Sequence, residues 1–305
     1  MSEYLLYTNS LTKTFKNHNA VNCIDIHIKK GAIYGLIGRN GAGKTTLLKM
    51  ISGLSKPTSG QIHIFAKNVN ELANLSKQIG CHIEAPGLYP EMTAYQNLKC
   101  KCIQRNINNT AYIKELLELV GLDSAGNKKT GKFSLGMKQR LGIAMALVGN
   151  PDLLVLDEPI NGLDPQGIRE VREILIKLNR ERGITIIVSS HILDELAKIA
   201  TDYGIIHNGE LVREIAVNDL MEQCKEKIMI KTQNPEKAAA VLDKLKIDSY
   251  SVVDDNSIEI FGYISESAHI NSELVNAGCK ISEITIQSDS LEDYYLKLTG
   301  GVQNV

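Results

Sequence analysis

The stretch Gly38-Arg39-Asn40-Gly41-Ala42-Gly43-Lys44-Thr45-Thr46 decides the fold of this 305-residue chain. It fits the pattern G-x-x-x-x-G-K-[ST], with an apolar run before it (Ala32–Ile37) and a helical pattern after it (Lys44–Gly53). Glycines let backbone N–H groups converge on phosphate oxygens without obstruction by Cβ atoms. Lys44 is expected to reach the β- and γ-phosphates of a nucleotide, and Thr45 to place its hydroxyl on Mg²⁺. The stretch therefore predicts a phosphate-binding loop at a helix N-terminus, where the helix dipole favours anions.

A second apolar run, Leu153-Leu154-Val155-Leu156, ends in two carboxylates, Asp157 and Glu158. The carboxyl ends of parallel strands open onto the ligand crevice of such a sheet. Asp157 is therefore placed to hold Mg²⁺, directly or through water, and Glu158 to polarise the attacking water. An apolar strand that ends in Asp-Glu is common by itself, but together with the phosphate-binding loop it indicates a site for ATP hydrolysis.

The apolar pattern predicts an α/β core from Leu5 to about Ile215. Nearly continuous apolar runs suit strands that are buried on both faces of a parallel sheet; they are Ala32–Ile37, Leu153–Leu156 and Ile184–Ser189. Helical patterns follow these runs at Lys44–Gly53, Gln166–Arg182 and Ile192–Ala200. The strands predicted near the N-terminus alternate more and look antiparallel; they are Leu5–Asn9, Ile24–Lys29 and Gln61–Phe65. An insert with helical periodicity occupies about Thr93–Gly149.

The pattern changes near Val217, after which no nucleotide motif follows. The order of predicted elements there is β-α-β-β-α-β and a final helix, at Lys227–Lys231, Pro235–Leu245, Ser249–Val253, Ser257–Phe261, Glu266–Ala277, Lys280–Ile286 and Leu291–Leu298. This order matches the ferredoxin-like split unit. We therefore expect two domains, residues 1–216 and residues 217–305. The second is expected to be a small α+β domain with this ferredoxin-like order, and the sequence assigns no chemistry to it.

The composition narrows the class of protein. With 34 basic and 35 acidic residues, the charge balance gives no reason to expect binding to nucleic acid or to an acidic lipid surface. No apolar run approaches the roughly 18 residues that a membrane span needs, and the N-terminus lacks the features of a signal peptide. The six cysteines show no zinc-site spacing and are expected to be reduced thiols. A cytoplasmic protein is expected, which would serve a membrane only through a partner.

Taken together, the motifs resemble those of the ATP-binding subunits of ABC transporters, over about the first 215 residues. Phe15 matches the aromatic residue that stacks on adenine in this family, and Phe133-Ser134-Leu135-Gly136-Met137-Lys138-Gln139-Arg140 matches the signature segment. Asn161-Gly162-Leu163-Asp164 is similar to the loop that crosses the dimer interface, and His191 matches the switch histidine that contacts the γ-phosphate. Outside such a set, an aromatic residue or a histidine of this kind is usually structural or incidental.

The resemblance implies the fold, the cofactors and the partners. The fold would be a P-loop ATPase core with an antiparallel β subdomain and a helical subdomain at about residues 85–149. ATP and Mg²⁺ would lie between the phosphate-binding loop of one copy and Ser134, Gly136 and Asp164 of another, in a head-to-tail homodimer or a heterodimer with a related ATPase. The membrane-spanning permease would be a separate chain, so that this subunit is peripheral at the inner face of the cell membrane.

Two departures from the family pattern narrow the resemblance. Leu135 and Met137 replace a glycine and a glutamine of the signature, while Ser134 and Gly136 are kept. Glu84 stands where the family's glutamine loop has glutamine. An ionised Glu accepts hydrogen bonds but cannot donate them, although it can bind Mg²⁺, so Glu84 is a candidate for both metal binding and catalysis. These features and the C-terminal tail resemble the ATPases of lantibiotic-immunity and bacitracin-resistance exporters, which implies a peptide-antibiotic substrate.

Two other functions stay open at this stage. One is a soluble ABC ATPase that acts on ribosomes or DNA, although this chain has one cassette, no sustained heptads and no basic excess. The other is a nucleotide-binding regulator that scarcely hydrolyses ATP, with Glu84 acting as a brake. Three observations distinguish these functions from an exporter ATPase. They are ATP-dependent dimerisation, the effect of Glu84→Gln on hydrolysis and the presence of a neighbouring permease gene.

Overall fold

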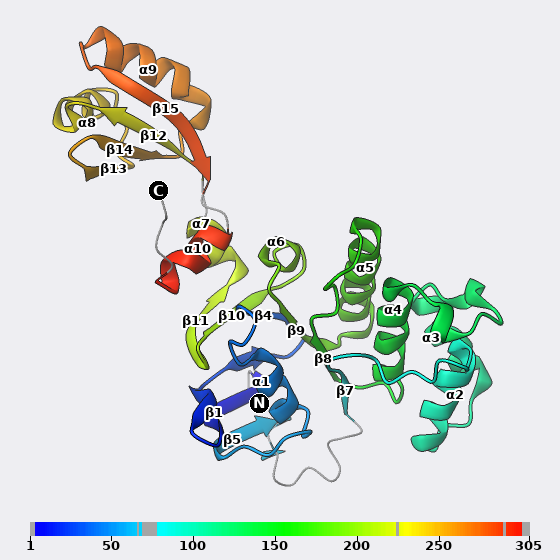
Figure 1. Cartoon of the computed structure of the whole chain (residues 1–305). Coiled ribbons are helices and arrows are strands. Elements are labelled where there is room, and N and C mark those ends of the chain that lie inside the picture. Colours follow the sequence, from blue (N-terminus) through cyan, green and yellow to red (C-terminus); the bar gives the residue numbers. More distant parts are fainter. Residues whose placement is uncertain (1–3, 66, 69–77, 224–225, 289–290, 301–305) are drawn as a thin grey trace. The chain divides into compact units, whose positions relative to one another are not determined.

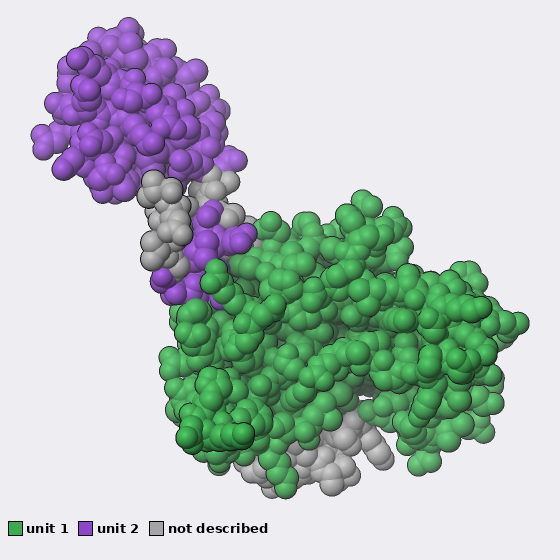
Figure 2. All heavy atoms as spheres, in the orientation of Figure 1, with its two compact units in different colours: residues 1–217 green, residues 218–305 purple. Residues whose placement is uncertain are grey.

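The computed structural model describes residues 4–65, 67–68, 78–223, 226–288 and 291–300. The chain divides into two compact units, residues 1–217 and residues 218–305 (Figure 2). None of the helices in the described residues has both the length and the apolar character that crossing a membrane requires.

A six-stranded sheet forms the centre of the first unit, in the order β11-β10-β4-β9-β8-β7 (Figure 1). All neighbouring pairs from β10 to β7 are parallel, and β11 pairs antiparallel at one edge. The strands are β4 (Ile33–Ile37), β7 (Ile79–His82), β8 (Leu153–Asp157), β9 (Thr185–Ser190), β10 (Asp202–His207) and β11 (Glu210–Ala216). Every residue of β4, β8 and β9 is buried, as the continuous apolar runs predicted for a parallel sheet.

The helices that follow these strands are α1 (Lys44–Ile51), α5 (Pro165–Arg182) and α6 (Leu193–Leu196). Asp164 caps α5 by accepting from the N–H of Gly167, and Gly183 ends it in the left-handed conformation. The helix predicted to run to Ala200 is wrong in length, because the backbone after Leu196 forms turns that lead to Thr201, whose N–H donates to the carbonyl of Ile33 in β4.

An antiparallel sheet lies beside the core sheet, as the alternating N-terminal strands predicted. Its order is β2-β1-β5-β6, with β3 also paired to β1; the strands are β1 (Tyr4–Phe15), β2 (His18–Ile24), β3 (His27–Lys29), β5 (Ser59–Ile64) and β6 (Lys67–Asn68). The single strand predicted for Ile24–Lys29 is wrong. The strand is interrupted between Ile24 and His27, because the hydroxyl of Thr8 donates to the carbonyl of Ile24 and accepts from the N–H of Ile26.

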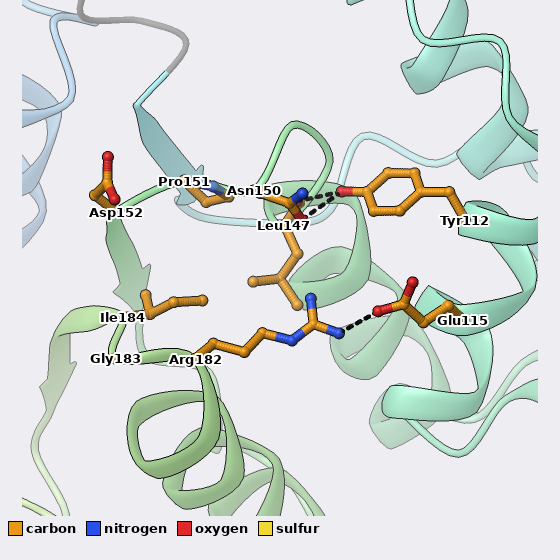
Figure 3. Close-up of a pocket in the computed structure, with 9 residues that line it drawn as sticks. All are labelled: Tyr112, Glu115, Leu147, Asn150, Pro151, Asp152, Arg182, Gly183 and Ile184. Atoms are coloured by element: carbon orange, nitrogen blue, oxygen red, sulfur yellow. Dashed lines mark hydrogen bonds and ion pairs between the residues drawn. The ribbon is translucent and has the colours of Figure 1, made fainter.

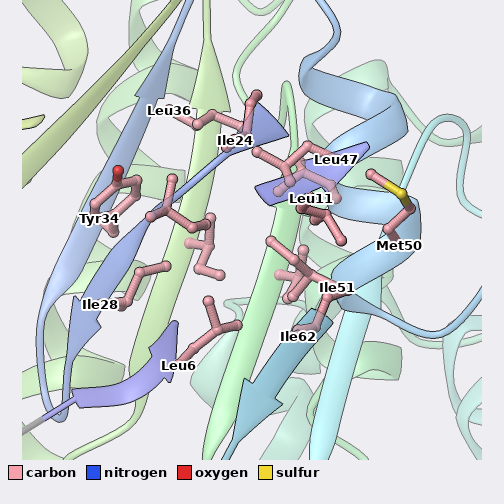
Figure 4. Packing of buried hydrophobic residues seen from close by; sticks show 14 of the residues in the cluster. Leu6, Leu11, Ile24, Ile28, Tyr34, Leu36, Leu47, Met50, Ile51 and Ile62 are labelled. Atoms are coloured by element: carbon pink, nitrogen blue, oxygen red, sulfur yellow. The ribbon is translucent and has the colours of Figure 1, made fainter. Parts of the chain in front are cut away.

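The hydrophobic core of the first unit joins the two sheets through α1. Figure 4 shows Leu11 of β1 beside Leu47 of α1, and Leu6 and Ile51 belong to the same cluster of fully buried side chains. Burial of a large aliphatic side chain stabilises a fold by about 1.5–3 kcal/mol. This packing fixes α1, and with it the loop that enters α1, against both sheets.

The predicted helical insert forms a subdomain of three α-helices, each capped by a polar side chain. Thr93 begins α2 (Ala94–Gln104) in a capping box with Gln96, Asn109 caps α3 (Thr110–Leu119), and Ser134 caps α4 (Leu135–Ala146). Two short 3₁₀ turns, Asp123–Ala125 and Thr130–Lys132, lie between α3 and α4. The subdomain returns to the core where α4 packs against β7.

The second unit contains the β-α-β-β-α-β order that the sequence predicted. Its four-stranded sheet has the order β13-β14-β12-β15, and all pairs are antiparallel. The elements of this part of the chain are α7 (Val217–Gln223), β12 (Glu226–Thr232), α8 (Pro235–Lys244), β13 (Tyr250–Asp254), β14 (Ser257–Phe261), a 3₁₀ turn (Ile264–Glu266), α9 (Ser267–Asn276), β15 (Ile281–Ser288) and α10 (Leu291–Leu298). A separate hydrophobic cluster, which includes Ile228, Leu242 and Leu274, packs α8 and α9 on this sheet.

Candidate functional site

The phosphate-binding loop lies between β4 and α1, in a backbone shape that requires glycine at two positions. A Cβ atom on Gly38 would lie 2.6 Å from the carbonyl oxygen of Ile206. Gly43 has a φ of +108°, and a Cβ atom there would lie 2.3 Å from the carbonyl oxygen of Ala20. Between them Arg39, Asn40 and Gly41 are exposed and Ala42 is buried. Gly38 and Gly43 therefore pack closely against the protein, and the residues from Arg39 to Gly41 are open to solvent.

The ammonium group of Lys44 connects this loop to the end of β8. Its Nζ donates to the carbonyl oxygen of Gly38 at 2.6 Å and to that of Arg39 at 3.3 Å, and the side chain is only 5% exposed. The same Nζ lies 3.2 Å from Oε1 of Glu158. This distance suits an ion pair, although Oε1 of Glu158 makes no hydrogen bond among the described residues. A buried cation therefore stands between the loop and the second carboxylate of the Asp-Glu pair.

The side chains of Asp157 and Thr45, both predicted to hold Mg²⁺, are in direct contact. The hydroxyl of Thr45 donates to Oδ2 of Asp157 at 2.7 Å, and the hydroxyl of Ser189 donates to Oδ1 at 2.6 Å. They come together because β4, β9 and β8 are neighbours in the sheet and their carboxyl ends share one edge. A hydroxyl and a carboxylate are oxygen ligands of the kind Mg²⁺ prefers, so these residues fit that ion when phosphate oxygens complete its coordination.

Glu158 and His191 form a pair at the same edge of the sheet. Oε2 of Glu158 lies 2.8 Å from Nδ1 of His191. Glu158 is in the left-handed conformation, with φ +49°, and its N–H donates to the hydroxyl of Ser189 at 2.9 Å. Ser189 thus bonds the carboxylate of Asp157 and the backbone of Glu158. Its only signal in the sequence was its place at the end of the predicted strand Ile184–Ser189.

Glu84 lies two residues beyond β7 and makes an ion pair with α1. Its Oε1 is 2.5 Å from Nζ of Lys49, and its side chain is 62% exposed. Lys49 follows Thr45 by one helical turn, so the two side chains share a face of α1. No motif in the sequence marks Lys49 as part of this site. In this structure the partner of Glu84 is therefore a lysine on the helix of the phosphate-binding loop, rather than Thr45 or Asp157.

The remaining residues predicted from the resemblance lie on the surface or at helix ends. Phe15 ends β1 with half of its side chain exposed and with Nζ of Lys13 5.2 Å from the centre of its ring. Ser134 is exposed at the start of α4, and its Oγ accepts from the N–H of Met137 at 3.2 Å. A Cβ atom on Gly136 would reach Leu163 at 3.8 Å, and Asp164 is exposed where it caps α5. The signature segment and the interface loop are thus neighbours.

A cavity of about 390 Å³ lies away from this edge, at the amino ends of β8 and β9 (Figure 3). Its polar groups are largely paired: Arg182 with Glu115 at 2.6 Å, and the hydroxyl of Tyr112 with the carbonyl of Leu147 and with Asn150. Since ligands of parallel sheets bind at the carboxyl ends of the strands, this cavity is separate from the phosphate-binding loop and carries no argument for a second ligand.

A buried histidine at the end of β7 also escaped the sequence analysis. Nε2 of His82 lies 2.5 Å from Oε1 of Gln139 in α4, and both side chains are buried. Burial lowers the pKa of His82, while the hydrogen bond to Gln139 and the charge of Asp157 oppose this effect. No sequence signal pointed to this contact, because β7 itself was not predicted.

The comparisons with known proteins agree with this geometry. The family model described as ABC transporter matches residues 21–161. A bacitracin transport ATP-binding protein of Bacillus licheniformis is 42% identical over 97% of this chain and 98% of its own length. A lantibiotic transport ATP-binding protein of Streptococcus pyogenes is 43% identical over 69% of this chain and 90% of its own length.

A solved structure gives the same result for the first unit. It is a dimeric post-hydrolysis state of an ATP-binding cassette bound to ADP and Pi. The cassette is 28% identical to this chain and aligns with a TM-score of 0.64. The alignment covers 70% of this chain and 98% of the cassette. The fold, the phosphate-binding loop and the relatives lead to one conclusion: the chain belongs to the ATP-binding subunits of ABC transporters and is an ATPase.

Proposed function

We propose that this ATPase powers a membrane exporter of peptide antibiotics of the bacitracin or lantibiotic type. The observation that carries this proposal is the similarity to a bacitracin transport protein along nearly the whole chain, so that it includes both units and not only the ATPase core. Export as the direction and a cationic or cell-wall-directed peptide as the substrate rest on that similarity. The membrane subunit would bind the peptide, and no residue here needs to touch it.

The phosphate-binding loop, Gly38 to Thr46, would hold the phosphates of ATP, and Lys44 would move from its loop carbonyls to the β- and γ-phosphates. Thr45 and Asp157 would hold Mg²⁺, which supplies charge neutralisation between the phosphates. Phe15, exposed at the end of β1, would stack on the adenine ring. The hydrogen bond between Thr45 and Asp157 supports this assignment, because it joins the two oxygen ligands before any ion binds.

Glu158 would act as the general base and His191 as the contact to the γ-phosphate. The 2.8 Å contact between them supports these roles, because a base needs a group that fixes its orientation. Lys44 neutralises the carboxylate of Glu158 from the other side. When Lys44 turns to the phosphates, Glu158 would lose that cation and become free to take a proton from water. Glu84 would approach the metal only by leaving Lys49.

The residues of one chain would form only half of the ATP site. In a single chain α4 packs against β7, while the phosphate-binding loop follows β4, and two strands lie between β4 and β7. A strand spacing of about 4.8 Å separates β4 from β7 by about 14 Å, so we infer that Ser134 and Gly136 act on the ATP of another copy. The N-terminus of α4 would present N–H groups to the γ-phosphate, and Asp164 would lie at the dimer interface. The partner copy would be identical or a related ATPase.

The proposed complex also needs a permease on a separate chain, which would place this subunit in the cytoplasm at the inner face of the membrane. The helical subdomain, at about residues 85–149, would receive the permease. We favour this reading over a soluble ATPase or a regulator that is not coupled to transport, because the relatives are transport proteins. The domain division that we propose, 1–216 and 217–305, leaves the C-terminal domain without an assigned chemistry.

Substitution of Glu158 by Gln tests the ATPase dimer. Without a base the variant should bind ATP and keep it, so that size exclusion with excess ATP shows a dimer that ADP does not produce. Glu181→Gln, at an exposed position of α5, is the matched control and should remain a monomer under the same conditions. A Glu158→Gln variant that stays monomeric with saturating ATP would count against the head-to-tail dimer.

Export of peptide antibiotics needs a test in cells. A strain in which the only copy of the gene for this protein carries Glu158→Gln should become sensitive to bacitracin or to a lantibiotic. Its sensitivity to an antibiotic that acts inside the cell should not change. Equal sensitivity to all three in the variant and the parent strain would contradict the proposed substrate class and leave the ATPase assignment intact.

A further inference from the structure

The edge strand β7 and the helix α4 are in direct contact through two glycines. A Cβ atom on Gly80 would lie 2.2 Å from the carbonyl oxygen of Ala146, and one on Gly142 would lie 2.8 Å from Nε2 of His82. Gly80 and His82 share one face of β7, since side chains alternate along a strand. The strand and the helix therefore fit each other closely, and the imidazole ring of His82 occupies the space that Gly142 leaves.

One buried hydrogen bond crosses this contact. Nε2 of His82 donates to Oε1 of Gln139 at 2.5 Å, and the side chains are 5% and 8% exposed. A buried polar group without a partner destabilises a fold, whereas two apolar groups of similar shape in its place can be neutral. The bond therefore adds little to stability compared with an apolar pair, but it fixes which residue of α4 lies against the end of β7.

The two ends of this bond lie next to the two segments where the chain departs from its family. His82 precedes Glu84 by two residues, and Gln139 follows Ser134 by five, about 7.5 Å along the helix. A displacement at the end of β7 thus reaches the N-terminal half of α4 through the hydrogen bond between these two side chains. This is a short, packed connection between the segment that carries Glu84 and the segment that carries Ser134.

We propose that His82 is a positioning residue that holds α4 in the register in which Ser134 faces the ATP of the partner copy. The bond makes the end of β7 and the start of α4 move as one body when ATP closes the dimer. The proposal rests on the head-to-tail dimer proposed above. His82 does not contact ATP in the proposed dimer, and the binding of ATP to one copy, at the loop after β4, is independent of His82.

The test compares two substitutions of His82. His82→Leu removes the hydrogen bond at similar volume, whereas His82→Gln keeps a donor that can reach Gln139. In the Glu158→Gln background, His82→Leu should raise the ATP concentration that half-saturates dimer formation about tenfold, and His82→Gln should stay within about threefold of the parent. With Glu158 intact, His82→Leu should lower kcat/KM, while the affinity of the monomer for a fluorescent ATP analogue stays within twofold. His269→Leu, at an exposed position of α9, is the control.

The outcomes separate this proposal from the proposed function. If the Glu158→Gln parent forms no dimer, the head-to-tail dimer and the role of His82 fall together. If the parent dimerises and His82→Leu dimerises equally well, only the role of His82 is overturned. It is also overturned if His82→Gln is as defective as His82→Leu, because packing rather than the hydrogen bond then matters. If His82→Leu does not fold, two other variants decide: His82→Gln, and Gln139→Glu, which keeps the accepting oxygen. Both should form the dimer at an ATP concentration within about threefold of the parent, and a larger defect in either variant overturns the role of the hydrogen bond.

Discussion

Nζ of Lys49 lies 2.5 Å from Oε1 of Glu84, so the charge of the unusual glutamate is neutralised from the helix that begins at the phosphate-binding loop. An unpaired carboxylate at this position would repel the γ-phosphate of ATP. The side chains of Lys49 and Glu84 are 36% and 62% exposed, so water screens their attraction. The pair therefore changes the local charge more than it changes stability.

Removal of Lys49 should weaken the binding of MgATP, and only while Glu84 is present. We expect Lys49→Gln to raise KM for MgATP about 1.4- to fivefold, which corresponds to the 0.2–1 kcal/mol of an exposed ion pair. In a Glu84→Gln background the same substitution should have no effect on KM. Steady-state ATPase assays of the parent, the two single variants and the double variant measure this coupling. Lys30→Gln, at an exposed position, is the control.

Glu84→Gln alone should leave hydrolysis intact or raise it, because the amide carries no charge and can both donate and accept hydrogen bonds. If this variant loses hydrolysis, Glu84 has an essential role at the metal or the water, and its pairing with Lys49 describes only the chain without nucleotide.

Ser189 should prove important for metal binding although it is no ligand in our proposal. Its hydroxyl donates to Asp157 and accepts from the N–H of Glu158. Loss of a residue that orients a metal ligand typically costs 10–100-fold in metal affinity, so Ser189→Ala should raise the Mg²⁺ concentration for half-maximal hydrolysis by about that factor. Titration of Mg²⁺ at fixed ATP measures it. Ser190→Ala, whose hydroxyl accepts from the N–H of Ile192, should leave this concentration unchanged.

These residues show what the sequence could and could not predict. Lys44, Thr45, Asp157 and Glu158 were predicted because each lies in a contiguous motif whose residue types fit one chemistry. Ser189 was missed because its role depends on β9 lying between β4 and β8, an order of strands that no local pattern encodes.

The fold shows the same division between local and long-range information. The strands of the second unit were predicted to within one or two residues, helped by segments such as Ser257–Phe261 in which polar and apolar residues alternate. The strand β7 was not predicted, because it has only four residues and contains Gly80 and His82, which mark no strand. The contact of His82 with α4, and that of Glu84 with Lys49, could therefore be found only in three dimensions.

Gly43 should not tolerate a side chain. Its φ of +108° strains any other residue, and a Cβ atom would lie 2.3 Å from the carbonyl oxygen of Ala20. Backbone strain of this kind costs about 1–3 kcal/mol, so Gly43→Ala should weaken ATP binding about 5- to 150-fold. Gly87→Ala is the control, because a Cβ atom there meets open space. Calorimetric titration with ATP measures both, and equal affinities would show that the loop takes another shape when it binds phosphate.

Tyr34 should make the first unit sensitive to alkali. Burial raises its pKa well above the ordinary value, and the nearby charge of Glu214, to which its hydroxyl donates at 2.7 Å, raises it further. In the unfolded chain Tyr34 loses its proton from about pH 10, while in the folded chain it keeps it. The unfolded state therefore binds fewer protons above that pH, and the free energy of unfolding falls by up to about 1.4 kcal/mol per pH unit.

Replacement of Tyr34 by Phe should remove this slope. At pH 8 the variant should be less stable by about 1.5–3 kcal/mol, because a hydrogen bond to a carboxylate is lost, and the difference from the parent should shrink as the pH rises above 10. Urea unfolding between pH 8 and 11 measures it, with Tyr89→Phe, whose side chain is 51% exposed, as the control. A difference that stays constant with pH would mean that Tyr34 ionises in the folded chain.

The second unit should fold without the first. Residues 226–288 contain the whole four-stranded sheet, α8, α9 and a hydrophobic cluster of their own, and the lantibiotic transport relative matches only 69% of this chain. A fragment of this size buries a small core and is marginally stable, by about 3–5 kcal/mol. We expect the isolated fragment to unfold cooperatively in a thermal melt followed by circular dichroism. Leu242→Ala should abolish the transition, because loss of a fully buried Leu costs about 2–5 kcal/mol. Val253→Ala, at a position 51% exposed, should keep the transition within a few degrees. A fragment without any transition would mean that this sheet depends on the rest of the chain.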